Sequence, residues 1–211
     1  MTITTAQFEA LTPVPYSQAR SQLQTGDILL FSSTGPFSLI IEHFTNSLWS
    51  HVGLVWRVGD EGFDRVLILE SLEDVGIRAV SASNRLNGTA AAPRPYDGHV
   101  LVARHNRLPA PLAPAQVTDM MRFGVDHLGY PYNPLELARI ATRIALGLAD
   151  VKLPGRLEPT NAYICSEFVA KCFEAVGVDL APDIEGYMAP ADIARDPDVE
   201  AVIAIRPDAP A

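Results

Sequence analysis

Residues 50–58, Ser-His-Val-Gly-Leu-Val-Trp-Arg-Val, decide how the first half of the chain folds. Side chains alternate between the two faces of a strand, so His51, Gly53 and Val55 share one face and the intervening apolar residues share the other. The stretch therefore predicts a buried strand that carries a histidine near its start. The glycine on the same face leaves room for another group to approach that histidine.

Four more strands are expected around this one. Short apolar runs bounded by Gly, Asp and Asn turns predict them at Ile28–Phe31, Arg65–Glu70, Gly76–Val80 and His99–Arg104. The turns lie at hairpin-like distances, which favours antiparallel pairing. The first half of the chain is thus predicted to form an antiparallel sheet.

The second half of the chain has the apolar spacing of helices. This spacing predicts helices at 115–128, 135–148, 163–176 and 190–195. In the first half of the chain, short helices are expected at 17–23 and 37–44. Residues 199–205 are expected to close the chain as an edge strand. Strands followed by helices predict one α+β domain over residues 1–211, with helices packed on one face of the sheet. Residues 133–160 are expected to form a helical insertion near the cleft.

The composition argues against several classes of protein. Apolar residues make up 48% of the 211 residues and charged residues 19%, as in ordinary globular domains. The formal net charge of −9 repels the phosphates of nucleic acids, so no nucleic-acid partner is expected. No segment has the roughly 18 apolar residues of a membrane span, and no secretory signal is recognisable. The two cysteines, too far apart along one predicted helix to bridge, favour a location in the reducing cytoplasm.

The motifs of nucleotide and serine chemistry are missing, and a cysteine remains as the candidate nucleophile. The sequence has no Gly-x-Gly-x-x-Gly, no phosphate-binding loop, no Gly-x-Ser-x-Gly and no Cys-x-x-Cys. Cys165 lies where turn-forming residues give way to a helix, and the free N–H groups and dipole of a helix start favour the thiolate. Cys172, two turns later, is expected to be buried and unreactive. The alternative is that Cys165 is also a small core residue.

A thiolate nucleophile needs a base and a group that orients the base. His51 is the best candidate base among the five histidines, because it begins a strand beside a glycine. Glu70 ends the strand 65–70 on the face of Val66 and Ile68, so it can hold the His51 ring if the two strands are neighbours. The alternatives are a histidine that caps a strand edge and a glutamate that emerges into solvent.

The segment Leu128-Gly129-Tyr130-Pro131-Tyr132-Asn133 leads from a helix toward Cys165. Tyr132 is a candidate donor to an oxyanion that forms near the sulfur, and aromatic packing in a turn is an equally good explanation. Glu167 is interpreted as structural, since it suits a helix start and has Lys171 four residues later.

These motifs, in this order, resemble the circularly permuted papain-like cysteine amidases of the NlpC type, the YiiX-like group. Lecithin:retinol acyltransferase is similar at a greater distance. Papain-like enzymes usually carry the nucleophile before the base, and here the histidine comes first, as a permuted chain predicts. The matching blocks extend in outline from Thr25 to Ile205 and comprise Gly26–Phe31, Ser50–Val55, Leu69-Glu70, Leu128–Tyr132 and Tyr163–Glu167.

The resemblance implies a papain-like fold and a cysteine hydrolase that cleaves an amide, with cell-wall peptides as the first substrate class, or an ester. It implies Cys165 as nucleophile, His51 as base, Glu70 as orienting group and Tyr132 as an oxyanion or substrate contact. Tyr163, close to the nucleophile, is a further expected substrate contact. This chemistry requires no metal and no organic cofactor.

Two other functions remain open. The first is acyl transfer or lipase activity on lipid acyl groups through the same thioester, and the second is a binding module without activity. Within 133–160, an apolar stripe with Arg139 and Arg143 one turn apart predicts a helix that covers the cleft and offers two cations to an anionic substrate. A helix packed on the core, or a dimer surface, is the more ordinary explanation. The expected partner is a small-molecule, peptide or lipid-like substrate.

Overall fold

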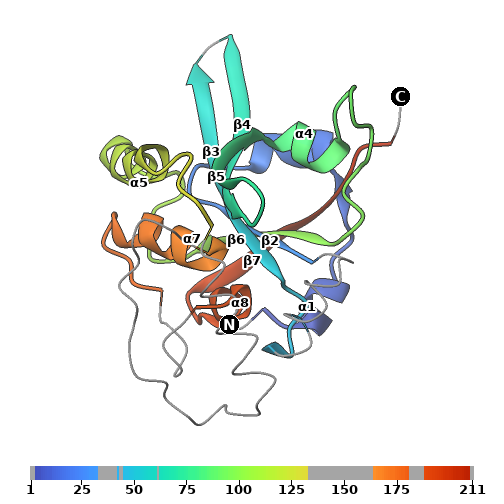
Figure 1. Cartoon of the computed structure of the whole chain (residues 1–211). Helices are drawn as coiled ribbons and strands as arrows, with labels where there is room; N and C mark the ends of the chain where they lie inside the picture. The colour runs from blue at the N-terminus through green and yellow to red at the C-terminus, as the bar shows by residue number, and fades with distance from the viewer. Residues whose placement is uncertain are drawn as a thin grey trace.

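The computed structural model describes residues 3–32, 42, 45–60, 62–132, 164–180 and 188–209. A curled sheet of seven strands forms its centre, in the order β1-β7-β6-β2-β3-β4-β5, and helices surround the sheet (Figure 1). Neighbouring strands are antiparallel except β1 and β7, which are parallel. The α+β class predicted from the sequence is confirmed.

The elements have the following bounds. The strands are β1 (Val14–Pro15), β2 (Ile28–Phe31), β3 (His51–Asp60), β4 (Phe63–Leu72), β5 (Gly76–Ser81), β6 (Val100–His105) and β7 (Val199–Arg206). The helices are α1 (Thr5–Glu9), α2 (Tyr16–Ala19), the 3₁₀ turn η1 (Arg20–Gln22), α4 (Ala82–Asn87), α5 (Pro114–Asp126), α7 (Cys165–Glu174) and α8 (Pro190–Arg195). None of these described helices has the length and apolar character needed to cross a membrane.

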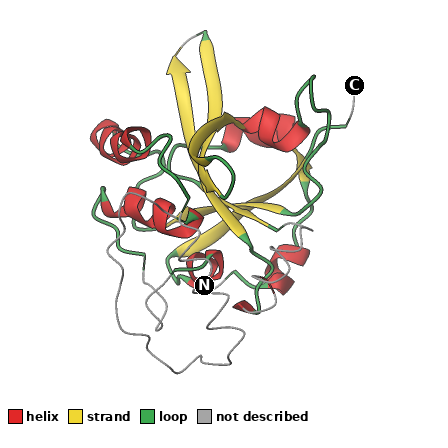
Figure 2. Ribbon diagram, in the orientation of Figure 1, coloured by secondary structure: helices red, strands yellow, loops and turns green. Residues whose placement is uncertain are grey.

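The sheet separates two apolar cores, with helices on both of its faces (Figure 2). Leu30 and Leu54 face the core formed with α5, α7 and α8, and Phe31 and Val55 face the core formed with α2 and α4. The expectation of helices on a single face was wrong. Alternate residues of β2 and β3 are apolar on both sides, so both faces require cover to exclude water.

Two further features differ from the sequence-based expectations. The strand at 199–205 is not at an edge, because Val14 and Pro15 pair in parallel outside β7. Two residues contain too little pattern to predict a strand. Helices α1 and α4 were not predicted, although Thr4 caps α1 by accepting from Gln7 N at 3.1 Å. Most of the helix expected at 37–44 and the whole of the insertion expected at 133–160 lie outside the described residues.

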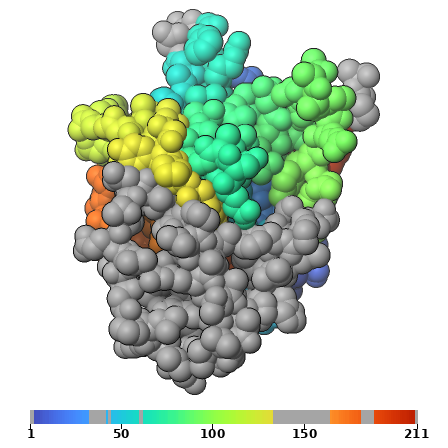
Figure 3. All heavy atoms as spheres, viewed as in Figure 1, coloured from blue at the N-terminus to red at the C-terminus, as the bar shows by residue number. Residues whose placement is uncertain are grey.

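The β3–β4 hairpin extends beyond the body of the molecule (Figures 1 and 3). Phe63 at its tip is 53% exposed. Below the tip, Arg57 of β3 donates two hydrogen bonds to the Asp64 carboxylate, at 2.9 and 2.7 Å. The same hairpin fixes the register of β3 against β4, with Gly53 opposite Glu70.

Gly53 packs directly beneath a branched side chain. A Cβ at this position would lie 2.8 Å from Ile68 Cγ2 and 3.3 Å from the Leu69 carbonyl oxygen. Ile68 is fully buried and cannot move aside. The space above the glycine, which the sequence suggested was open to a group approaching His51, is therefore occupied by β4.

Gly53→Ala is expected to destabilise the fold by about 1–3 kcal/mol, because the added methyl overpacks the β3–β4 interface. Urea unfolding followed by circular dichroism measures this. Ala79→Val, on the exposed face of β5, adds more volume and should change the free energy of unfolding by less than about 0.5 kcal/mol. An equal effect of the two substitutions would contradict the packing described here.

Candidate active site

Strand pairing brings His51 and Glu70 together. His51 begins β3, and Glu70 lies opposite Gly53 on β4, so the two side chains are diagonal neighbours on one face. His51 Nε2 lies 2.9 Å from Glu70 Oε2. The Glu70 side chain is fully buried and the His51 side chain is 14% exposed. The alternative in which Glu70 emerges into solvent is thus excluded by its position.

Two arginines complete the environment of the Glu70 carboxylate. Arg78, directly opposite on β5, donates to Oε1 from Nη2 at 2.6 Å and from Nε at 3.0 Å. Arg85 of α4 donates from Nε to Oε2 at 3.2 Å. Burial opposes ionisation of Glu70, but the hydrogen bond and charge of His51, followed by the charges and bonds of Arg85 and Arg78, hold its pKa below the ordinary value. The carboxylate is therefore ionised and fixed in place at neutral pH.

Arg85 is itself held by two rings. Its guanidinium lies 5.0 Å from the ring centroid of Phe31 and 4.9 Å from that of Tyr96. Tyr96 donates its hydroxyl to the Ser32 carbonyl at 2.7 Å, which anchors the second ring. Neither Arg78 nor Arg85 was among the residues singled out from the sequence.

Cys165 is close enough to His51 to affect its ionisation. The bond to Glu70 uses Nε2, which leaves Nδ1 as the ring nitrogen available to the sulfur. Burial would lower the pKa of His51, but the charge and side-chain hydrogen bond of Cys165, and then those of Glu70, raise it to about 9. With this raised pKa, the His51 ring is protonated at neutral pH.

The start of α7 provides backbone donors around the sulfur. Cys165 is the first residue of the helix and is 6% exposed. The first helical bond runs from Phe168 N to Ile164 O at 3.0 Å, so the N–H groups of Cys165 and Ser166 have no acceptor within the helix. The Ser166 hydroxyl donates to the Met188 carbonyl, which ties this turn to the segment before α8. The local structure that the sequence predicted for the cysteine is confirmed.

Glu167 stabilises the start of α7 by a hydrogen bond to the backbone. Its Oε2 accepts from Ile164 N at 3.4 Å. The expected pair between Glu167 and Lys171 is not formed, because Lys171 donates to Glu174 instead. Cys172, deeper in the helix, is fully buried, and burial raises the pKa of its thiol. Cys172 is buried as expected, and Cys165 is buried as well.

Tyr132 lies near the sulfur because a short backbone pairing holds the segment before it. Ile77 N donates to the Tyr130 carbonyl and Gly129 N donates to the Ile77 carbonyl, both at 2.9 Å. This approach requires Gly76, since a Cβ there would lie 2.2 Å from the Tyr130 oxygen. Burial, and then the charges of Cys165, Glu73 and Glu167, raise the pKa of Tyr132. Tyr132 is therefore a protonated hydroxyl donor in the electrostatic field of the cysteine.

The remaining predicted contacts lie outside the described residues. These are Tyr163, Arg139 and Arg143. The sequence did contain a signal for Arg78. The short turn after β4 places Arg78 opposite Glu70 once the register of the β4–β5 hairpin is known. Arg85 had no comparable signal, because the helix that carries it was not predicted.

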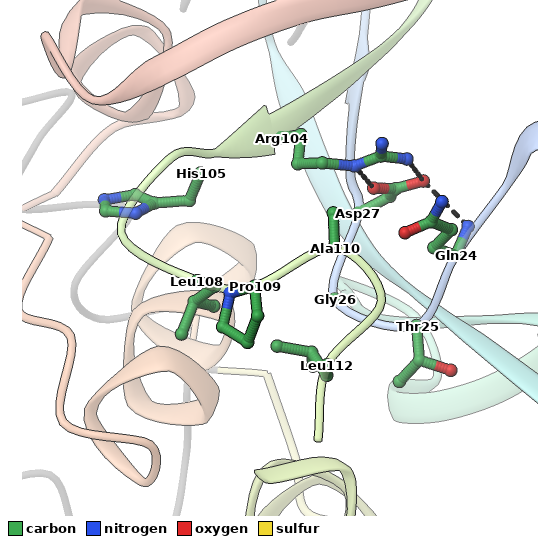
Figure 4. A pocket seen from close by; sticks show the side chains of 10 residues that line it. All are labelled: Gln24, Thr25, Gly26, Asp27, Arg104, His105, Leu108, Pro109, Ala110 and Leu112. Carbon is green, nitrogen blue, oxygen red and sulfur yellow. Dashed lines mark hydrogen bonds and ion pairs between the residues drawn. The ribbon is translucent and has the colours of Figure 1, made fainter. Parts of the chain in front are cut away.

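The described residues contain one cluster of side chains with the spacing of metal ligands, away from Cys165. It consists of His105, Asp196 and Asp198, whose potential ligand atoms lie within 4.8 Å of one another. A small pocket adjoins His105 and contains the buried ion pair between Asp27 and Arg104 (Figure 4). Neither feature includes a residue of the Cys165–His51–Glu70 group.

The comparisons with known proteins identify a similar fold. No protein-family model matches the chain, and no curated protein matches it. Among solved structures, it is similar to one described as the metalloprotein YiiX from Escherichia coli O157:H7, DUF1105. The two share 17% sequence identity with a TM-score of 0.59, over 88% of this chain and 99% of YiiX. The chain therefore has a YiiX-like fold.

Proposed function

We propose that the chain is a cysteine hydrolase of amide or ester bonds, a permuted papain-like enzyme in which Cys165 is the nucleophile. The observation that carries the proposal is the position of His51, whose Nε2 bonds to the buried Glu70 carboxylate at 2.9 Å and whose pKa is raised by the neighbouring Cys165. Acyl transfer to sulfur requires a nucleophile, a base that contacts the nucleophile, and a group that orients the base.

In the first half of the reaction, the Cys165 thiolate attacks the substrate carbonyl carbon and forms a C–S bond. The oxyanion of the tetrahedral intermediate accepts hydrogen bonds from the free N–H groups at the start of α7 and from the Tyr132 hydroxyl. The carbon–nitrogen or carbon–oxygen bond then breaks, and the His51 imidazolium gives its proton to the departing amine or alcohol.

In the second half, water attacks the thioester. His51, now neutral, takes the proton of the water, and the carboxylic acid leaves as the C–S bond breaks. Glu70 remains ionised throughout, because two guanidinium groups and the histidine share its charge. Its role is to fix the ring with Nδ1 toward the sulfur.

Reaction with p-nitrophenyl acetate tests the proposal directly. We expect one acetyl group on Cys165, located by peptide mass spectrometry, and continuous release of p-nitrophenol as water regenerates the thiol. Cys165→Ala should abolish both, and Cys172→Ala, on the same helix, should retain both. Turnover that survives in Cys165→Ala would eliminate the proposal. If the acetyl-enzyme accumulates and is released only when an amine is added, the activity is acyl transfer and not hydrolysis.

Alkylation by iodoacetamide should report the thiolate at Cys165. At pH 7 we expect Cys165 to react faster than a cysteine in the denatured chain, and Cys172 to remain unmodified in the folded protein. His51→Ala should slow the reaction of Cys165 by about tenfold or more, because the positive partner of the thiolate is lost. Asp119→Asn, at an exposed position of α5, serves as the control and should leave the rate unchanged. Equal rates in wild type and His51→Ala would show that His51 does not activate the thiol.

The raised pKa of His51 also makes stability depend on pH. The folded protein keeps a proton that the unfolded chain loses above its pKa of 6.5, up to the folded value of about 9. The contribution of His51 alone is complete below pH 6.5 and decreases as pH rises toward 9, by on the order of 3 kcal/mol. A Cys165 thiolate contributes with the opposite sign, because the unfolded thiol keeps a proton that the folded sulfur has lost, so the measured slope is the sum of the two contributions. Urea unfolding at intervals between pH 6 and about 8.5 measures the slope. His51→Gln should flatten it, and an unchanged slope in that variant would contradict the assignment.

A further inference from the structure

The far end of the sheet carries a cluster unrelated to the proposed chemistry. His105 ends β6, Asp196 follows α8, and Asp198 immediately precedes β7. One ring nitrogen of His105 and one carboxylate oxygen of each aspartate lie within 4.8 Å of one another. Ligands about 2.1 Å from a metal lie roughly 3–4 Å apart, so small side-chain movements bring these atoms to the spacing of donors that share one cation.

The register of the strands separates this cluster from Cys165. Val100 lies opposite Phe31, and Phe31 lies opposite His51, so one end of β6 is near the candidate active site. His105 is at the other end of β6, about 16 Å further at about 3.3 Å per residue. Figure 4 shows Arg104 and His105 leaving β6 in opposite directions, Arg104 toward Asp27 and His105 away from it.

His105 supplies the nitrogen of the cluster from a buried position. The residue is 1% exposed, and its ring packs against Phe173 with centroids 5.6 Å apart. Nδ1 accepts from Arg107 N at 3.2 Å, so Nε2 is the ring nitrogen that remains for a cation. Burial lowers the pKa of His105, and the charges of Asp196 and Asp198 oppose this effect. A neutral imidazole is the form that ligates metals.

The two carboxylates are incompletely neutralised. Asp196 Oδ1 accepts from Asp198 N at 2.8 Å. Asp198 Oδ2 pairs with Arg107 Nε at 2.6 Å, and the Arg107 side chain is 63% exposed. One arginine therefore faces two aspartates, and because its side chain is largely in solvent, it can be displaced from Asp198 at low cost.

We propose that His105, Asp196 and Asp198 form a binding site for a first-row divalent transition cation, with Zn²⁺ as the representative ion. One nitrogen and two carboxylate oxygens, without sulfur, are ligands suited to Zn²⁺, Mn²⁺ or Fe²⁺ rather than to Ca²⁺ alone. Three protein ligands leave a fourth position for water. The bound cation fastens the end of β6 to the turn between α8 and β7, so its role is structural and independent of chemistry at Cys165.

Titration calorimetry with ZnCl₂ on the full chain tests the site. The host is Cys165→Ala, because the thiolate is a competing zinc ligand. We expect one Zn²⁺ per chain, an affinity at least about tenfold lower in Asp198→Asn, and no change in Asp119→Asn, an exposed aspartate on α5. Ca²⁺, added as CaCl₂, should bind much more weakly than Zn²⁺. Equal affinities would show that the cluster is an ordinary acidic surface and would overturn the proposal.

Arg107→Ala provides a test in which binding increases. Removing the competing guanidinium should raise the Zn²⁺ affinity several-fold and increase the Zn²⁺-induced shift in melting temperature. This variant keeps all three ligands, so a loss of folding in Asp198→Asn does not obscure the result. Failure of both the host and Arg107→Ala to bind Zn²⁺, or identical binding by the host and Asp198→Asn, would overturn the proposal.

Discussion

The candidate active site depends on one buried charge. The Glu70 carboxylate has no contact with solvent, and a buried carboxylate is stable only when hydrogen-bond donors and positive charges surround it. Its donors come from three separate elements: His51 from β3, Arg78 from β5 and Arg85 from α4. The position of each element is thereby constrained by the needs of a single side chain. Removing any one donor leaves the others around a charge that is less well compensated.

Much of this arrangement follows from local patterns. The alternation in residues 50–58 predicts β3, and the apolar row that ends in Glu70 predicts β4. A two-residue turn between the strands then sets the pairing that brings His51 and Glu70 together. The start of α7 at Cys165 was also predictable, because turn-forming residues precede an amphipathic segment there. These inferences succeed because each relies on neighbours in sequence or on one hairpin.

Other features depend on contacts between distant segments. Arg85 lies on a six-residue helix with little periodicity, and it is fixed by rings from Phe31 and Tyr96. The parallel pairing of Val14 with Ile205 joins the two ends of the chain, and no local signal in a two-residue strand announces it. The assignment of helices to both faces of the sheet was missed for a similar reason. An apolar residue indicates that it is buried, but not which helix covers it.

The charges around His51 indicate how the proposed dyad is balanced. Two guanidinium groups already exceed the single negative charge of Glu70, so this carboxylate has limited capacity to stabilise a further positive charge. After burial, the charge of Cys165 is accordingly the largest influence on the pKa of His51, ahead of Glu70. Glu70 then acts mainly by orienting the ring, whereas the sulfur supplies the negative charge that keeps the ring protonated. In the proposed mechanism, the protonated histidine is the positive partner of the nucleophilic sulfur.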